Sequence, residues 1–150
     1  MRSQREALEQ EIRIAAAPET VFSYFVDPDR MIKWKGISAT LDPRPGGVYR
    51  VDINGRDVAR GEYLEVRPHT RVVFTWGWEG SGDPVPPGST IVEVSLEPDG
   101  DGTVVRLVHR DLPEDAREQH RQGWEHYLDR LAAASSGADP GPDPWSSLEA

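Results

Sequence analysis

The sequence predicts an α+β fold, in which a curved antiparallel sheet of about six to seven strands packs against one long C-terminal helix. Between residues 36 and 110, short runs of nearly alternating apolar and polar residues are bounded by Gly, Pro and Asn, as strands with tight turns are. Residues 113–134 carry an apolar stripe at steps of three and four, the period of an α-helix. Two short helical segments are expected between the first strand and the strands of residues 36–110.

The N-terminal part predicts one strand and two short helices. Residues 8–14, LEQEIRI, alternate moderately and indicate the first strand. The run PETVFSYFV at 18–26 is amphipathic at helical spacing. Asp27 and Pro28 end this helix, because the residue before a proline is disfavoured in the helical region. The next run, PDRMIKWKG at 28–36, predicts a second short helix or turn.

The middle of the chain predicts strands that are joined mostly by short loops. The runs are ISATL (37–41), VYRVDI (48–53), VARGEYLEV (58–66), RVVFTWGW (71–78), STIVEVSLEP (89–98) and TVVRLVHR (103–110). Asn54-Gly55 is a favourable hairpin turn, since both residues tolerate positive φ. The loop GSGDPVPPG at 80–88 fits either a semi-rigid flap at the rim of a pocket or a plain hairpin connection. An antiparallel meander is therefore the simplest topology.

The long helix carries unusual residues on its inward stripe. The stripe consists of Ala116, His120, Gly123, Trp124, Tyr127, Leu128, Leu131 and Ala134. A mid-helix glycine costs about 1 kcal/mol relative to alanine, so Gly123 indicates space for a strand aromatic or for a ligand. At the start of the helix, Asp111 and Pro113 predict a cap, and Glu114 places acid in the positive first turn.

We expect residues 1–134 to form a single domain and residues 135–150 a C-terminal tail. A chain of 150 residues suits one substantial core. After Ala134, glycines and prolines follow one another too closely for a helix to continue. Trp145 in this tail fits packing on the same chain or on a partner.

Composition argues against several classes of protein. A net charge of −9, with Lys33 and Lys35 as the only lysines, disfavours nucleic acid as a partner. The absence of cysteine excludes disulfides and thiolate chemistry. No run approaches the roughly 18 apolar residues of a membrane span, and the N-terminus has no apolar signal core, so we expect a cytoplasmic protein. Nucleotide-binding and serine-nucleophile motifs are missing and the histidine spacing does not suit a metal, so we expect no cofactor, metal or catalytic residue.

Strand alternation places further side chains on the sheet face that is turned toward the helix. They are Val72, Phe74, Trp76, Trp78, Thr90, Val92, Val94, Leu96, Thr103, Val105, Leu107 and His109. Burial of one aromatic side chain stabilises the fold by about 4–6 kcal/mol gross. Packing in a filled core therefore explains these aromatic residues as well as a ligand cavity does. Inward His109 and His120 need partners, which could be structural groups or the polar end of a ligand. Glu62 is the candidate cavity carboxylate.

Five segments, in order, resemble those of a known family. They are APETVFSYFVDPDRMIKWKG, PGGVYRVDI, GEYLEVRPHTRVVFTWGW, TVVRLVHRDLP and GWEHYLDRL. Together they are similar to the bacterial branch related to activators of heat-shock protein 90 ATPase, within the START-like superfamily also called SRPBCC. The resemblance covers about residues 8–134 and implies the helix-grip fold, a curved sheet around a long helix with a cavity between them. This scaffold serves lipid carriers, polyketide cyclases, hormone receptors and co-chaperones, so it does not by itself select a function.

The preferred hypothesis is a non-enzymatic module that binds a small hydrophobic or amphipathic molecule. The expected cavity residues are Trp34, Glu62, Phe74, Trp76, Trp78, His109, His120, Gly123, Trp124 and Tyr127. One alternative is a co-chaperone-like role with a protein partner or a homodimer. Another is a cyclase-like or hydrolytic enzyme that uses a cavity histidine with Glu62.

Overall fold

Seven antiparallel strands form one curved sheet in the computed structural model, which describes residues 7–80 and 84–146. The elements are β1 (Leu8–Ile14), α2 (Pro18–Val26), α3 (Pro28–Met31), β2 (Ser38–Leu41), β3 (Val48–Asp52), β4 (Val58–Arg67), β5 (Arg71–Trp76), β6 (Thr90–Asp99), β7 (Gly102–Arg110), α4 (Glu114–Ser135) and the 3-10 turn η1 (Pro144–Ser146). The strand order is β1-β7-β6-β5-β4-β3-β2. The meander from β2 to β7 is thus completed by β1 at the far edge, beside β7.

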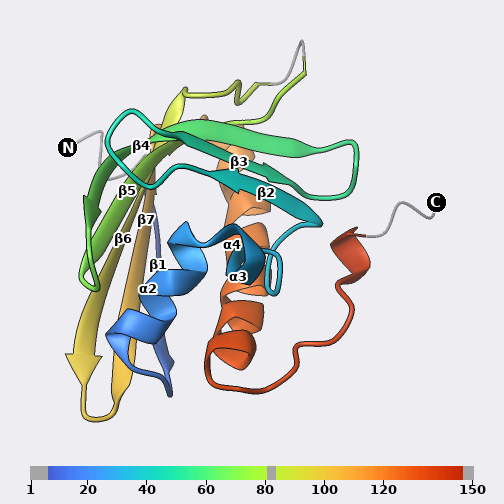
Figure 1. Ribbon diagram of the computed structural model, residues 1–150. Helices are drawn as coiled ribbons and strands as arrows, with labels where there is room; N and C mark the ends of the chain where they lie inside the picture. Colours follow the sequence, from blue (N-terminus) through green and yellow to red (C-terminus); the bar gives the residue numbers. More distant parts are fainter. Residues whose placement is uncertain (1–6, 81–83, 147–150) are drawn as a thin grey trace.

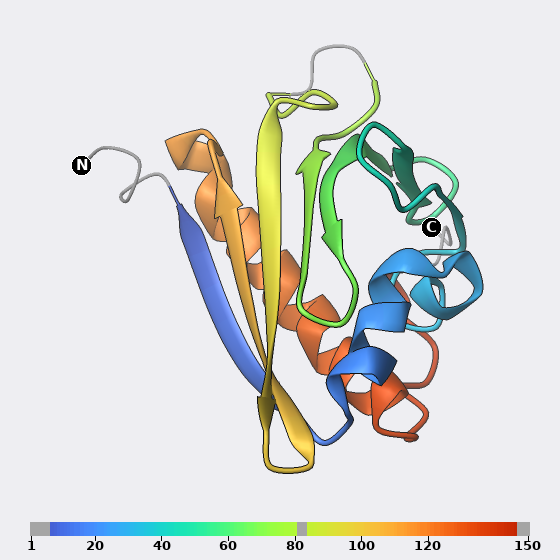
Figure 2. The same cartoon turned by 60° about the vertical axis from the view of Figure 1, so that its left-hand side comes forward.

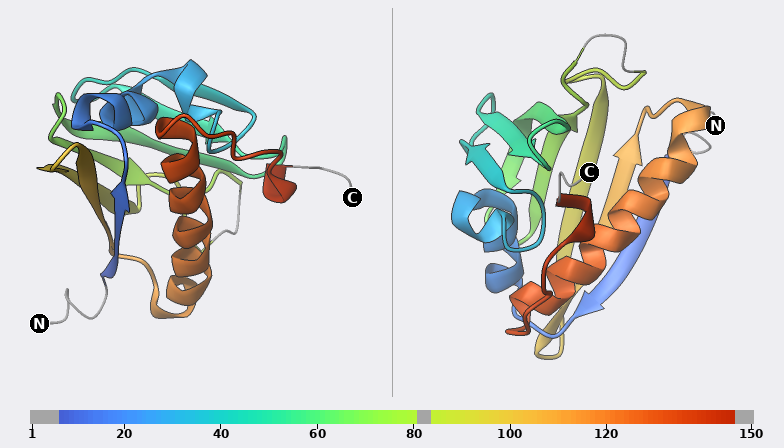
Figure 3. Two further views of the ribbon diagram at one scale, coloured as in Figure 1. Left: turned by 90° about the horizontal axis from the view of Figure 1, so that it is seen from below. Right: turned by 90° about the vertical axis from the view of Figure 1, so that its right-hand side faces the viewer.

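The sheet wraps around α4, which runs across its concave face (Figures 1 and 2). The short helices α2 and α3 lie beside α4 and close the space between the β1 edge and the β2 edge, as the view from below shows (Figure 3). This arrangement confirms the predicted α+β helix-grip architecture. No helix in the described part of the chain is long and apolar enough to cross a membrane.

The inward faces predicted from strand alternation are confirmed. Of the twelve side chains that we expected to face the helix, all are buried except Trp78, which is half-buried. Alternate residues on the outer face form ion pairs, such as Arg110 with Glu93 and Arg106 with Glu11. The sheet therefore has one apolar and one charged face, as an antiparallel sheet with one solvated side should.

The hairpin at Asn54-Gly55 is shaped by side-chain hydrogen bonds. Asn54 Oδ1 accepts the backbone N–H groups of Arg56 and Asp57, and its amide donates to Asp57 Oδ2 at 3.0 Å. Gly55 adopts a φ of +88°, which glycine tolerates best. The turn consequently holds Asn54 and Asp57 together at one end of the sheet.

The start of α4 differs in part from the prediction. Glu114 and Asp115 lie in the first turn, so the expected acid near the positive end of the helix dipole is confirmed. The predicted cap by Asp111 is wrong, because Pro113 occupies the N-cap position and no side chain in the described residues caps it. Asp111 instead turns the chain before the helix, with a φ of +71°.

The chain beyond α4 turns back alongside the helix (Figure 1). The ring of Trp145 contacts His126 and Tyr127 of α4. Arg130 donates to the carbonyl oxygens of Pro140 and Gly141 at 3.3 and 3.0 Å. His126 Nε2 lies 2.8 Å from Asp143 Oδ1, and the His126 ring stacks on the Trp145 ring with centroids 3.9 Å apart. Of the two alternatives for Trp145, packing on its own chain or on a partner, these contacts agree with the first.

Candidate functional site

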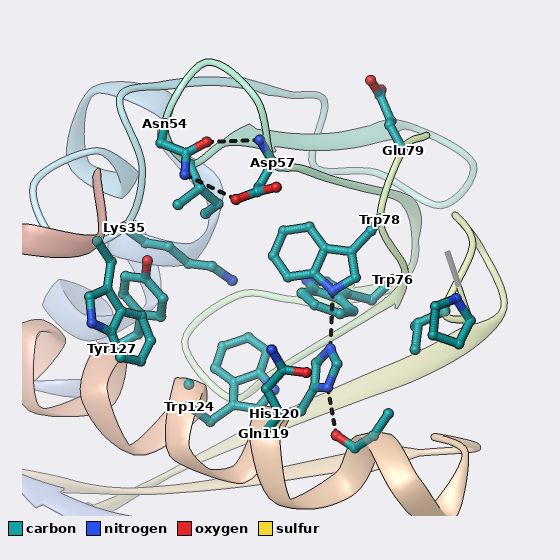
Figure 4. A pocket seen from close by; sticks show the side chains of 16 residues that line it. Lys35, Asn54, Asp57, Trp76, Trp78, Glu79, Gln119, His120, Trp124 and Tyr127 are labelled. Atoms are coloured by element: carbon teal, nitrogen blue, oxygen red, sulfur yellow. Dashed lines mark hydrogen bonds between the residues drawn. The ribbon is translucent and has the colours of Figure 1, made fainter. Parts of the chain in front are cut away.

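A cavity of about 500 Å³ lies between α4 and the end of the sheet that carries the β3–β4 and β5–β6 connections. Six of the ten predicted residues line it: Trp76, Trp78, His120, Gly123, Trp124 and Tyr127. The tryptophans Trp76 and Trp78 come from β5 and the residues just after it, and the other four from one face of α4. Figure 4 shows Trp76 and Trp78 on one side of the open space, and Trp124 and Tyr127 on the other.

The other four predicted residues lie elsewhere. Trp34, Phe74 and His109 are fully buried behind the cavity wall. Phe74 stacks on Tyr49 in the packed core, with ring centroids 4.1 Å apart. Glu62 is exposed, because the alternation of β4 turns its neighbour Tyr63 inward and therefore Glu62 outward. The expected pairing of a cavity histidine with Glu62 is thus not formed.

His109 is held by a directed chain of hydrogen bonds. The Trp124 indole N–H donates to His109 Nδ1 at 3.0 Å, so this nitrogen carries no proton. The Thr90 hydroxyl donates to the Trp76 carbonyl oxygen, which leaves its oxygen to accept from His109 Nε2 at 2.8 Å. Burial, aided by the nearby His120 and Lys35, lowers the pKa of His109 well below its ordinary value. His109 is therefore a neutral structural group, with both ring nitrogens occupied.

His120 forms part of the cavity wall and is also doubly bonded. The Trp78 indole N–H donates to His120 Nε2 at 3.1 Å, and His120 Nδ1 donates to the Ala116 carbonyl oxygen at 2.8 Å (Figure 4). The Ala116 carbonyl lies one helical turn earlier in α4, so the ring is fixed against its own helix. His120 thus orients Trp78 at the edge of the cavity.

Lys35 is the functional candidate that the sequence reasoning missed. Its side chain is only 3% exposed and reaches into the cavity, where Nζ lies 4.2 Å from the ring centroid of Trp124. The rings of Trp76 and Tyr127 are each 5.6 Å away. Burial lowers the pKa of Lys35 to about 7. Lysine is among the residues least often found fully buried, so Lys35 becomes a candidate functional residue of this cavity.

The turn after α3 explains why Lys35 points inward. The Lys35 N–H donates to the Met31 carbonyl oxygen, which continues the last turn of α3. Gly36 then adopts a φ of +87° and starts the chain toward β2. The run MIKWKG contains both lysines on either side of Trp34, but Lys33 is exposed. Neither a helical nor a strand period applies to such a turn, so periodicity could not predict that Lys35 is buried and Lys33 exposed.

Polar side chains also line the cavity. Asp57 and Gln119 are exposed and Glu79 is half-buried, which places these three toward solvent, whereas Asn54 is buried. Glu79 is paired with Arg50 at 3.0 Å and with Arg60 at 3.4 Å, and its hydrogen bond to Arg50 lowers its pKa. Its charge is therefore largely balanced on the outer side of the sheet.

Gly123 and Trp145 meet at the cavity wall. A Cβ atom added at Gly123 would lie 4.0 Å from the Trp145 ring, which is ordinary van der Waals contact. Trp145 also meets Tyr127 edge to face, with centroids 5.7 Å apart. The missing side chain at Gly123 thus leaves open the space that the tail indole borders.

The loop at 80–88 contributes Pro84 and Val85 to the lining. The main-chain N–H of Trp78 donates to the Val85 carbonyl oxygen at 2.7 Å, which joins the two sides of this loop. Residues 81–83, on which the expectation of a flap or a plain connection partly rests, lie outside the described residues.

The curved sheet, the enclosing helix and the cavity between them define a helix-grip protein of the START-like, or SRPBCC, superfamily. The profile of the family described as "Activator of Hsp90 ATPase homolog 1-like protein" matches residues 15–136. The chain belongs to this family, as the sequence resemblance predicted.

Solved structures agree with this assignment. An AHSA1-like protein from Rhizobium etli is 42% identical, with a TM-score of 0.73, over 93% of this chain and 87% of that one. CalU16 from Micromonospora echinospora is 30% identical, with a TM-score of 0.71, over 87% and 76% of the two chains. The Aha1 dimer from Colwellia psychrerythraea shares the fold at 21% identity, with a TM-score of 0.75, over 87% and 96%. No protein with a curated description matches the chain.

Proposed function

We propose that this protein binds a small hydrophobic or amphipathic molecule, without turnover, in the cavity between the sheet and α4. The observation that carries the proposal is the cavity itself, about 500 Å³ with Trp76, Trp78, Trp124 and Tyr127 in its walls. Small-molecule sites typically span about 300–1,000 Å³ and combine apolar walls with few convergent polar groups.

Two features support a binding cavity over a loosely filled core. The lining includes the amine of Lys35, which an apolar core would exclude because an unpaired buried charge is costly. It also includes Gly123 in the middle of α4, at a cost of about 1 kcal/mol relative to alanine. Both features lower the stability of the empty protein, which a ligand-binding role explains.

The hydrogen bonds of the two histidines support binding without chemistry. His109 and His120 each have both ring nitrogens engaged, and Glu62 faces away from the cavity. A general acid–base pair needs a group within hydrogen-bond reach of the substrate and free to exchange a proton. The wall residues are better arranged to hold a molecule than to transform it.

The proposal is tested by native mass spectrometry of the purified protein and by displacement of the uncharged dye Nile red. Gly123→Leu projects a side chain into the cavity and should weaken dye binding at least tenfold. Gln122→Leu, at the neighbouring exposed position of the same helix, should bind the dye like the wild type. A protein that binds neither dye nor any co-purifying molecule contradicts the proposal, and so does equal binding by the two variants.

A co-chaperone-like role is the second candidate, and the description of the family supports it. The Colwellia neighbour, described as a dimer, also makes a homodimer worth testing. Addition of saturating protein should raise the ATPase rate of a bacterial chaperone of the Hsp90 class, and Gly123→Leu should leave that increase intact. An unchanged rate rules this candidate out, and the sedimentation velocity of the protein alone reports a homodimer.

A further inference from the structure

We propose that the bound molecule carries an anionic group of the carboxylate type, which the Lys35 amine and the Trp76 indole N–H hold at the inner part of the cavity. This inference rests on the proposed function, because it assigns a ligand chemistry to the same cavity. The apolar body of the molecule would then lie along the indoles of Trp78 and Trp124.

Lys35 has no counter-ion among the residues that the structure describes. Its amine makes no ion pair or hydrogen bond with them, and its contacts are the faces of aromatic rings, the nearest being Trp124 at 4.2 Å. A cation over an aromatic face gains about 0.5–2 kcal/mol, which only partly offsets the loss of hydration. An anion in the cavity would complete this site, because a charge-assisted hydrogen bond is among the stronger ones available to a buried amine.

Trp76 supplies a second donor. Its indole nitrogen is buried and has no acceptor among the described residues, although the residue lines the same cavity as Lys35. Buried N–H groups in native proteins are nearly always paired, so an unpaired one in a cavity wall indicates a missing acceptor. The tryptophan N–H and the protonated lysine are donors only, so the fitting partner has two acceptor atoms, as a carboxylate does.

The other charged and titratable groups around the cavity are either neutral or paired within the protein, so Lys35 is the group that would attract an anion. His109 of β7 and His120 of α4 are neutral by their hydrogen bonds, and burial raises the pKa of the Tyr127 hydroxyl. Asp57 and Glu79 lie toward solvent, where Asn54 and two arginines respectively hold them. Lys35 is the one lysine or arginine among the described lining residues, so an anion has a single favourable position.

The proton equilibrium of Lys35 gives the site a pH signature. Because burial lowers the pKa of Lys35 to about 7, the empty site becomes uncharged as the pH rises above neutrality. A bound anion favours the protonated amine and raises this pKa, so binding takes up a proton. The affinity for a carboxylate should therefore fall roughly tenfold per pH unit above pH 7.

Matched probes separate the charge from the apolar body. Isothermal titration calorimetry would compare 2-naphthylacetate with 2-naphthylacetamide, and octanoate with octanamide, at pH 6.5 and 8.5. We expect the wild type at pH 6.5 to prefer each carboxylate at least tenfold over its amide. Lys35→Met should abolish this preference and its pH dependence without weakening amide binding, whereas Lys33→Met, at the exposed lysine two residues away, should retain both.

The outcomes distinguish the two proposals. Equal affinity of the wild type for carboxylate and amide, or a preference that survives in Lys35→Met, overturns the anion site while ligand binding stands. Failure of all four probes and of Nile red to bind overturns the proposed function together with this inference. The pH dependence of the wild type alone tests the site without any variant, so the proposal does not depend on the folding of Lys35→Met.

Discussion

Aromatic side chains fill one part of the interior and surround a cavity in another. Tyr49, Tyr63 and Phe74 pack as a cluster in which Tyr49 and Phe74 stack at 4.1 Å, and the Tyr63 hydroxyl donates to the Phe25 carbonyl oxygen of α2. Around the cavity, Trp76 and Trp78 also meet at 4.8 Å, edge to face, but the space before them is open. The two regions share one sheet and one kind of residue.

The difference lies in what faces the aromatic rings. Phe25 of α2 and Trp34 of the turn after α3 belong to the same buried core as the filled cluster, and their rings meet at 5.3 Å. The cavity is faced by Gly123, which has no side chain, and by Lys35, whose amine cannot be packed as an apolar group can. A cavity thus arises from one small and one charged residue rather than from the aromatic wall itself.

The largest effect that this comparison predicts is a loss of stability in the filled cluster. Phe74→Ala should lower the free energy of unfolding by about 3–5 kcal/mol, because a fully buried ring leaves a void among stacked neighbours. Trp78→Ala, at the half-buried cavity wall, should lower it by only about 1–2 kcal/mol. Urea unfolding measures both, and similar losses would show that the cavity is packed as tightly as the cluster.

The second effect concerns the pH dependence of stability. The pKa of Lys35 is about 7 in the folded protein and about 10.4 in an unfolded chain, so between these values the unfolded state binds more protons. The penalty for burying the amine is complete below pH 7 and disappears as the pH rises toward 10.4. The free energy of unfolding of the wild type should therefore rise relative to Lys35→Met by about 1.4 kcal/mol per pH unit near pH 8–9.5.

Urea unfolding of both proteins across this pH range measures the difference in their free energies of unfolding. The buried tyrosines are present in both proteins, so their contribution cancels in this difference. Lys33→Met is the control, since the exposed Lys33 should give no slope. A flat difference between the wild type and Lys35→Met would mean that the Lys35 amine is hydrated in the folded protein.

The sequence predicted the sheet and the stripe of α4 because both depend on periodic burial. Trp76, Trp124 and Tyr127 followed from the same periods and do line the cavity. Periodicity predicts on which face of a strand or helix a side chain lies, but not whether that side chain reaches the cavity. Phe74 and His109 lie on the predicted faces and are buried behind the cavity wall. Lys35 lies in an irregular turn between α3 and β2, where no period applies.

The third prediction separates the two histidines. Trp124→Phe removes the donor to His109 Nδ1 in a fully buried site, and the unpaired nitrogen should lower the free energy of unfolding by about 1–3 kcal/mol. Trp78→Phe removes the donor to His120 Nε2, which can bond to water in the cavity, so the loss should stay below about 1 kcal/mol. Equal losses in thermal and urea unfolding would contradict the assignment of His109 as the enclosed member of the pair.

The smallest effect concerns Gly123, where the cavity allows a methyl group. Gly123→Ala should raise the free energy of unfolding by about 0.5–1 kcal/mol, because alanine favours the helix and its Cβ would only touch Trp145 at 4.0 Å. The exposed Gln122→Ala in the same helix should change it by no more than a few tenths of a kcal/mol. Urea unfolding at pH 7 compares the two. A destabilised Gly123→Ala would mean that the Trp145 indole packs directly on the glycine in solution and that the tail, rather than open space, explains the missing side chain.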